Sequence, residues 1–279
     1  MDIDPAKLAE HVKDAPYFEL PECLGGKWYL PSFGRVELFG RSIDLQLTKF
    51  MVLELAVAAL MILIFVPLAR KIQSGQPPRG RLGNLFEAML LFVRDEMVRP
   101  AIGHHDADRF LPFIWNAFFF VLFCNLLGLL PWAGSPTGAI SVTGALALVA
   151  FATVVGAGMR KYGVVKFWTG LAPHMDLPLV LAIFLKPMIL AIEILGLFIR
   201  HGILAVRLLA NMFAGHLVLA VILGFIVLFA NSALWYGIMP ASVLGATALN
   251  LLELLVALLQ AYIFAFLTAL FIGMAVHQH

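Results

Sequence analysis

The chain has 279 residues, of which 62% are hydrophobic and 13% charged, and its mean hydropathy is +0.94. A soluble globular domain averages about 45–50% apolar and about 25% charged residues, so the composition excludes that class and indicates an integral membrane protein. The formal net charge of +2, without an arginine-rich stripe that alternates with aromatic residues, excludes nucleic acid as a partner.

The residues before Phe50 contain no apolar core of the length that a cleaved signal needs, and they are too acidic for a transit peptide. We therefore expect residues 1–48 to form a tail and the first membrane span to direct insertion. Cys23 and Cys124 have neither metal-ligand spacing nor a disulfide framework, so we expect no metal and no other cofactor.

Five apolar stretches predict an all-α, polytopic membrane protein with a single membrane domain over residues 49–276. The predicted spans are about 50–69, 110–130, 138–159, 178–230 and 241–276. As helices, the last two would be ~78 Å and ~54 Å long, against a hydrocarbon core of ~30 Å. The fourth stretch therefore either folds back as two spans or lies at a steeper tilt than the usual 0–40°.

Basic residues predict the orientation of these spans. The loop between the first and second spans contains Arg70, Lys71, Arg79, Arg81, Arg94 and Arg99, and Arg160, Lys161 and Lys166 follow the third span. The positive-inside rule places both clusters in the cytoplasm. The N-terminal tail and the turn at Pro131, Gly134, Ser135 and Pro136 are then outside, and the C-terminus is cytoplasmic.

Residues 84–99, within the first of these loops, alternate apolar and charged side chains at helical spacing. This pattern predicts an amphipathic helix. Such a helix either lies on the membrane surface or packs against other subunits, and the sequence favours neither alternative.

Four charged residues recur at intervals of seven within the fourth stretch: Lys186, Glu193, Arg200 and Arg207. A step of seven residues turns a helix by only about −20°, so the four share one slowly winding face. A charge at mid-bilayer costs from ~2.5 to ~10 kcal/mol, which favours a functional role. For Lys186 and Arg200, snorkelling or pairing with a neighbouring acid explains the charge equally well.

Arg207 is the strongest candidate. The nearest acid in its stretch, Glu193, is ~21 Å away along a helix, so its counter-charge must come from elsewhere. Ala210 and Ala214, on the same face, would let another helix pass closely. Because guanidinium keeps its proton, Arg207 can attract a carboxylate and repel a cation but cannot relay protons.

Further polar residues lie on the last two stretches. Asn211 extends the Arg207 face, whereas His216 points nearly the opposite way, and Asn250, Glu253 and Gln260 form a stripe on the last helix. A histidine and a carboxylate in a hydrated cleft can relay protons. The alternative is a buried His216–Glu253 pair that only holds two helices together.

Three segments together resemble subunit a of the rotary F-type ATP synthase: Arg207 to His216 (RLLANMFAGH), Leu259 to Phe264 (LQAYIF) and Asn125 to Pro131 (NLLGLLP). The resemblance covers the chain from the first span to the last helix. It implies that the two overlong helices lie tilted against the ring of c subunits, with Arg207 facing the ion-carrying carboxylate of the ring.

The resemblance also implies a role for each remaining candidate. Asn211, His216, Glu253 and Gln260 would form a half-channel from the outside, and Glu193 would lie near a half-channel to the cytoplasm. Many bacterial members have glutamate at the His216 position and histidine at the Glu253 position, so this chain exchanges the pair. The secondary candidates are Lys186, Arg200, Asn250 and Asn125.

The expected function is therefore a proton channel in a bacterial inner membrane, assembled with the c ring, the peripheral-stalk b subunits and the rest of the F1Fo ATP synthase. The sequence has no P-loop pattern, so we expect no catalysis by this chain. A secondary transporter or a proton-relay subunit of a respiratory complex is the alternative, although no second copy of the Arg207 segment is present.

Overall fold

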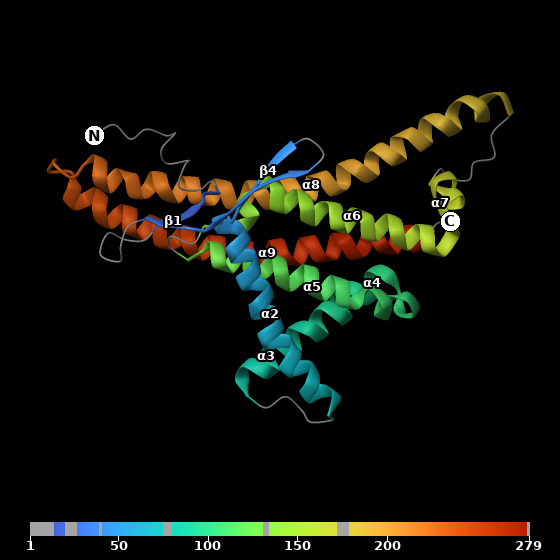
Figure 1. Cartoon of the computed structure of the whole chain (residues 1–279), viewed down its shortest axis with the longest axis horizontal. Helices are drawn as coiled ribbons and strands as arrows, with labels where there is room; N and C mark the ends of the chain where they lie inside the picture. Colours follow the sequence, from blue (N-terminus) through green and yellow to red (C-terminus); the bar gives the residue numbers. More distant parts are fainter. Residues whose placement is uncertain are drawn as a thin grey trace. The chain divides into compact units, whose positions relative to one another are not determined.

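The structure, a computed structural model, describes residues 14–19, 27–38, 41–74, 80–130, 134–171 and 179–277. Five of its helices are long and apolar enough to cross a membrane, and they follow one another along the chain in Figure 1. The prediction of an all-α, polytopic membrane protein is thereby confirmed. Pro131, Pro178 and residues 1–13, 20–26 and 39–40 of the N-terminal tail lie outside the described residues.

The described part of the tail forms two short antiparallel hairpins, which were not predicted from the sequence. Strand β1 (Tyr17–Glu19) pairs with β2 (Lys27–Tyr29), and β3 (Ser32–Leu38) pairs with β4 (Arg41–Gln46). The chain then enters helix α2 (Lys49–Gln73). The carboxylate of Asp14 accepts a hydrogen bond from the Phe50 N–H (3.2 Å), which satisfies one of the free amides at the start of α2.

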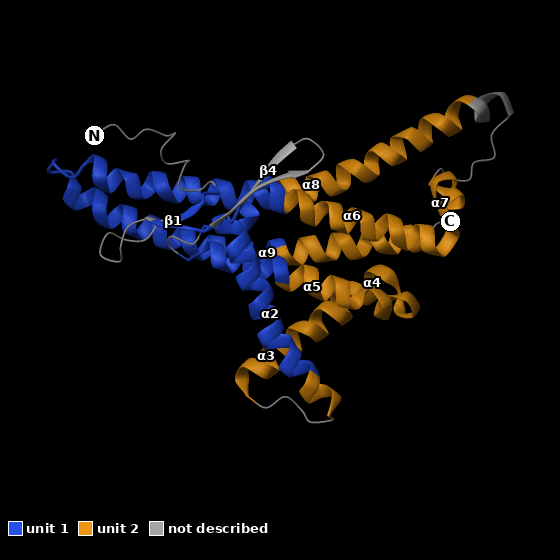
Figure 2. Cartoon of the chain, viewed as in Figure 1, with its two compact units in different colours: residues 1–69, 120–142, 208–260 blue, residues 70–119, 143–207, 261–279 orange. Residues whose placement is uncertain are grey.

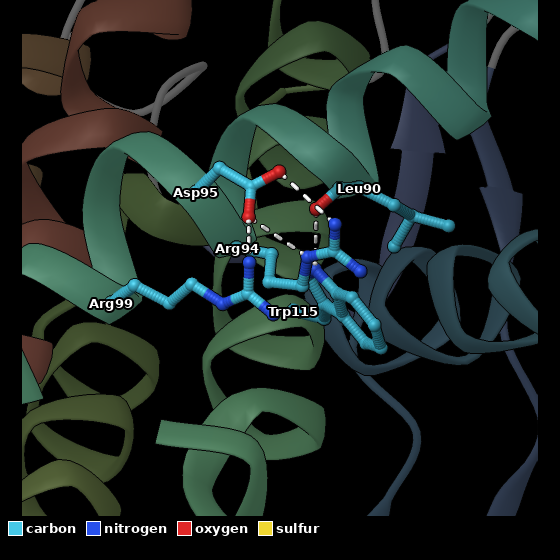
Figure 3. A network of polar contacts seen from close by, with 5 residues as sticks. All are labelled: Leu90, Arg94, Asp95, Arg99 and Trp115. Atoms are coloured by element: carbon cyan, nitrogen blue, oxygen red, sulfur yellow. Dashed lines mark hydrogen bonds and ion pairs between the residues drawn. The ribbon is translucent and has the colours of Figure 1, made fainter. Parts of the chain in front are cut away.

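The predicted amphipathic segment consists of α3 (Arg81–Phe92), a π-helical turn η2 (Val93–Val98) and α4 (Arg99–Ile102). Arg94 Nε and Arg99 Nη1 both donate to Asp95 Oδ1, at 3.0 and 2.7 Å (Figure 3). The hydrogen bond from Arg94 lowers the pKa of the Asp95 carboxyl. Trp115 of α5 (His104–Gly128) donates to the Leu90 carbonyl (3.0 Å), so one face of the segment packs on its own chain.

The remaining membrane helices are α6 (Ile140–Tyr162), α8 (Leu179–Leu228) and α9 (Trp235–Val276), with a short helix α7 (Val164–Gly170) between the first two. Helix α8 is continuous over 50 residues, so the fourth stretch does not fold back. At 1.5 Å per residue, α8 and α9 are ~75 and ~63 Å long, which exceeds twice the ~30 Å hydrocarbon core. Their length therefore favours the tilted alternative.

Contacts divide the chain into two compact units, shown in two colours in Figure 2. Unit 1 comprises residues 1–69, 120–142 and 208–260, and unit 2 comprises residues 70–119, 143–207 and 261–279. Helices α5, α8 and α9 each contribute to both units. A single membrane domain over residues 49–276 stays a prediction.

Two links hold the helix ends of unit 2 together. Lys161 of α6 forms an ion pair with Asp106 of α5 (2.8 Å), and the Tyr162 hydroxyl donates to the Val276 carbonyl of α9 (2.8 Å). Gly273 of α9 lies against the backbone carbonyl of Ala101 in α4, so closely that a methyl group there would overlap that oxygen. The absence of a side chain at Gly273 therefore allows α9 to pack against α4.

This close approach generates a prediction for Gly273→Ala. The new methyl group meets backbone, which cannot rotate away as a side chain can, so we expect a loss of about 1–3 kcal/mol, the usual cost of overpacking. Gly237→Ala on the same helix is the control, because nothing lies within 4 Å of a Cβ there. Thermal unfolding of the purified protein should show a lower midpoint for Gly273→Ala only, and equal midpoints would contradict the contact.

Candidate functional site

The structure brings Asn211 of α8 and Gln260 of α9 together in unit 1. Asn211 Nδ2 donates to Gln260 Oε1 at 3.0 Å, and Gln260 is only 4% exposed. An apolar environment offers such amides no other partner, so their mutual bond joins the two helices and fixes both side chains. The two residues belong to the set that the resemblance assigned to the outer half-channel.

His216 of α8 and Glu253 of α9 belong to the same unit. His216 Nε2 and Glu253 Oε1 are both buried, and neither has a hydrogen-bond partner among the described residues. A Cβ placed at Gly215 would touch the Glu253 carboxylate, so Glu253 lies against the α8 backbone at the residue that precedes His216. Unit 1 thus contains two proton-exchanging groups with hydrogen-bonding capacity to spare.

Asn125 of α5 differs from this pair because its hydrogen bonds are used. Its Nδ2 donates to the Ala257 carbonyl of α9 (3.5 Å), and its Oδ1 accepts from Thr137 (2.7 Å). Thr137 lies in a 3-10 turn η3 (Pro136–Gly138) and also bonds to Ser135 (2.7 Å). The fully buried Asn125 therefore links α5, η3 and α9, which indicates a structural role.

Lys186, Glu193, Arg200 and Arg207, which recur at intervals of seven residues, are called the seven-residue series below. Unit 2 contains Glu193 and Arg200 of this series. Glu193 Oε2 and Arg200 Nη2 are 3.8 Å apart. Arg200 thus pairs with a neighbouring acid, which is one of the two explanations, snorkelling or pairing, considered for its charge. Both residues line a cavity of about 400 Å³, together with Leu197, Phe271 and His277. An acid, a cation and a histidine thus border a single space within unit 2.

The structure gives Arg207 no ion pair with any residue in the described ranges, and its side chain is half-buried. Arg207 is in unit 2 and Leu208, the next residue, is in unit 1. Lys186 and Asn250 are both exposed, and the described part of the chain offers them no hydrogen bond or ion pair. The seven-residue series therefore contains one internal pair and two cations that the described residues do not neutralise.

Two buried polar residues, His201 and Lys49, were not predicted from the sequence. His201 is 3% exposed and lies beside the rings of Phe151 and Phe271, at centroid distances of 5.3 and 5.1 Å. Its Nδ1 bonds the Leu197 carbonyl (2.9 Å), and its Nε2 has no partner within the described ranges. The sequence feature that could have revealed His201 is its polar side chain within an apolar stretch, but His201 does not belong to the seven-residue series.

Lys49 is the second such residue. It is 6% exposed and opens α2, with its ammonium 5.3 Å from the centre of the Phe50 ring. The ammonium also lies beside Gly134, which has a positive φ of 72°. Only its position at the border of the first apolar stretch could have suggested that this lysine is buried.

Comparisons with known proteins point to one family. The sequence model of the family described as ATP synthase A chain matches residues 51–273. The chain is 40% identical over 244 residues to ATP synthase subunit a of Myxococcus xanthus (strain DK1622), covering 85% of this chain and 76% of that protein. It is 39% identical over 278 residues to ATP synthase subunit a of Chloroherpeton thalassium (strain ATCC 35110 / GB-78), covering 98% and 78%.

A third relative is ATP synthase subunit a of Methylobacterium sp. (strain 4-46). The chain is 37% identical to it over 222 residues, which cover 79% of this chain and 84% of that protein. The similarity therefore extends over most of each sequence.

The hydrogen bonds of Asn125 generate a prediction for Asn125→Leu. The substitution keeps the branched shape of the side chain but removes both bonds, so we expect a loss of roughly 1–3 kcal/mol, typical for a buried polar group left without its partner. Asn250→Leu is the matched control, since Asn250 is exposed on α9. Denaturant unfolding of the purified complex should separate the two variants; a similar effect of both would argue against the network.

Proposed function

Because this chain belongs to the ATP synthase A chain family, we propose that it conducts protons to the c ring of an F1Fo ATP synthase as subunit a. Its membrane helices provide two half-channels that open on opposite sides of the membrane. The observation on which the proposal depends is Arg207, a permanent charge within a 50-residue apolar helix and without an acidic partner among the described residues.

Unit 1 forms the outer half-channel. The amide pair of Asn211 and Gln260 is 3.0 Å apart, and the buried His216 and Glu253 have unused hydrogen-bonding atoms. Histidine and carboxylate side chains exchange protons, whereas amides orient water without changing charge. Protons pass along these four residues through bound water and neutralise a carboxylate of the c ring.

Unit 2 forms the inner half-channel. Its cavity of about 400 Å³ is lined by Glu193 and His277, both of which accept and release protons. Arg200 pairs with Glu193 at 3.8 Å and keeps that carboxylate from facing the apolar interior without a counter-charge. A ring carboxylate that has turned through the lipid loses its proton toward this cavity.

Arg207 separates the two paths. Its fixed positive charge attracts the ionised ring carboxylate and repels protons that would leak directly between the half-channels. Each elementary charge that crosses 100 mV yields ~2.3 kcal/mol, and this energy turns the ring. The chain itself does not catalyse ATP synthesis, in keeping with the absence of a P-loop pattern from its sequence.

The proposal includes partners and location. The chain assembles with the c ring, the b subunits of the peripheral stalk and the remaining F1Fo subunits in a bacterial inner membrane. The multi-pass arrangement rests on the five apolar helices. The basic clusters, which include Arg160 and Lys161 at the end of α6, support a cytoplasmic C-terminus and an N-terminus on the outer side.

Replacing Arg207 tests its proposed role as the fixed positive charge that separates the two half-channels. We expect Arg207→Ala to abolish ATP-driven proton pumping and to increase passive leak, because nothing then separates the two half-channels. Arg207→Lys should fail nearly as completely, since an ammonium lacks the planar fork and can lose its proton when desolvated. The measurement is proton flux in vesicles that contain the reconstituted complex.

Arg200→Gln is the control in the same series, because Arg200 already pairs with Glu193. We expect it to reduce flux or assembly by a modest factor only. Coupled pumping at the normal rate in Arg207→Ala would remove Arg207 from the mechanism, and loss of all flux in assembled Arg200→Gln would reverse the ranking of the two arginines.

The pair of His216 and Glu253 gives a separate prediction. If both belong to one relay, exchanging them in His216→Glu with Glu253→His should restore more flux than either single exchange. Each single exchange places two like groups in the same low-dielectric site, where they repel, whereas the double exchange restores one of each.

Flux must be expressed per assembled complex, because a purely structural pair would also show coupling in stability. A control for assembly is the amount of c ring that copurifies with each variant. Additive losses without rescue in the double exchange would show that His216 and Glu253 act in separate places.

A further inference from the structure

A groove between α5 and α6 lies within unit 2, apart from the residues of the proposed half-channels. It encloses about 280 Å³. Helix α5 contributes Arg109 and Phe110, whereas α6 contributes Arg160 and a row of small residues, Ala152, Gly156 and Ala157. The small residues create the space, and the two arginines give it a positive charge.

Neither arginine is neutralised by the part of the chain that the structure describes. The neighbouring cation, Lys161, pairs with Asp106 at 2.8 Å, but the same ranges contain no ion pair of Arg109 or Arg160. Asp108 precedes Arg109 in α5 and points about 100° away around the helix. The groove therefore has two cationic side chains that no acidic side chain of the described residues neutralises.

The two arginines stand at a defined depth in the sequence. No Asp, Glu, Lys or Arg occurs from Phe110 to Met159, so Arg109 immediately precedes the apolar part of α5 and Arg160 immediately follows that of α6. Charged side chains at this border lie at the level of the lipid headgroups. The phosphates of the same leaflet are the anions present at that level.

The groove's chemistry suits a phosphate group rather than a larger ligand. Guanidinium groups bind phosphate oxygens through two parallel N–H bonds and are weakly hydrated. Thr153 also lines the groove, but its hydroxyl donates to the Val149 carbonyl (2.8 Å). The arginines therefore supply the hydrogen-bond donors for a bound phosphate. Pockets for small molecules begin near 300 Å³, so about 280 Å³ holds a headgroup while the acyl chains stay in the bilayer.

We propose that this groove binds the headgroup phosphate of an anionic phospholipid from the leaflet next to the loop of residues 70–109. Basic pockets between membrane helices on the cytoplasmic side recognise such headgroups. The bound lipid fills the space left by the small residues of α6 and ties the ends of α5 and α6 together. The site does not depend on proton conduction by unit 1 or unit 2.

The test compares the detergent-purified complex that contains the native chain with a complex that carries Arg109→Gln and Arg160→Gln. Phospholipid extracted from each sample is quantified by class. We expect the double variant to retain about one anionic phospholipid fewer per copy of this chain. The matched control is Arg81→Gln with Lys166→Gln, which removes two exposed charges outside the groove and should retain the native amount.

Thermal stability provides the second readout. Added phosphatidylglycerol should raise the unfolding midpoint of the native and control complexes, and should raise that of the groove variant by less than half as much. Phosphatidylcholine and inorganic phosphate at the same concentration should have little effect. An equal shift with phosphatidylcholine would overturn recognition of headgroup charge, and a full shift with inorganic phosphate would assign the groove to the free ion.

Ala152→Leu keeps the test informative if the double variant fails to assemble. Ala152 is exposed and lines the groove, so a larger side chain fills the space without removing a charge. We expect the same loss of one anionic phospholipid per chain. Native retention in either assembled variant would contradict the site.

Discussion

A bilayer core offers no water to polar groups, and this constraint sorts the polar residues of the chain. Asn125 bonds to Thr137 and Ala257, and Asn211 bonds to Gln260; these amides are satisfied within the protein and hold helices together. The buried atoms of His216 and Glu253 have no partner among the described residues. In the proposed function, such groups are stable because water and the c ring reach them.

The length of helix α8 allows one helix to carry polar residues of both proposed half-channels. Glu193 and His216 lie on one continuous helix, and the 23 helical steps from one to the other extend ~35 Å, more than the ~30 Å hydrocarbon core. A single helix therefore contributes to both units, with Glu193 and Arg200 in unit 2 and Asn211 and His216 in unit 1. Arg207 follows the first pair and precedes the second along the chain.

The sequence predicted the features that depend on helical periodicity. It did not predict the contacts of a side chain with a partner on another helix or turn. Apolar length predicted the five membrane helices, and the seven-residue series identified the charged face of α8. Periodicity could not show that Asn125 bonds to η3, because the partner lies across a turn. Nor could it show that Lys49 is buried or that His201 lies beside two aromatic rings of other helices. Periodicity tells which residues share a helix face, but it does not tell which element packs against that face.

The central claim is that the chain contains two aqueous paths that open on opposite sides of the membrane. Its most direct test uses single cysteines in a chain whose Cys23 and Cys124 are replaced by Ser, with Asn211→Cys in unit 1 and Met274→Cys at the cavity of unit 2. A membrane-impermeant thiol reagent is applied to one side of sealed vesicles at a time. We predict that Met274→Cys reacts only from the cytoplasmic side and Asn211→Cys only from the outer side; reaction of both from the same side would contradict the presence of two separate paths.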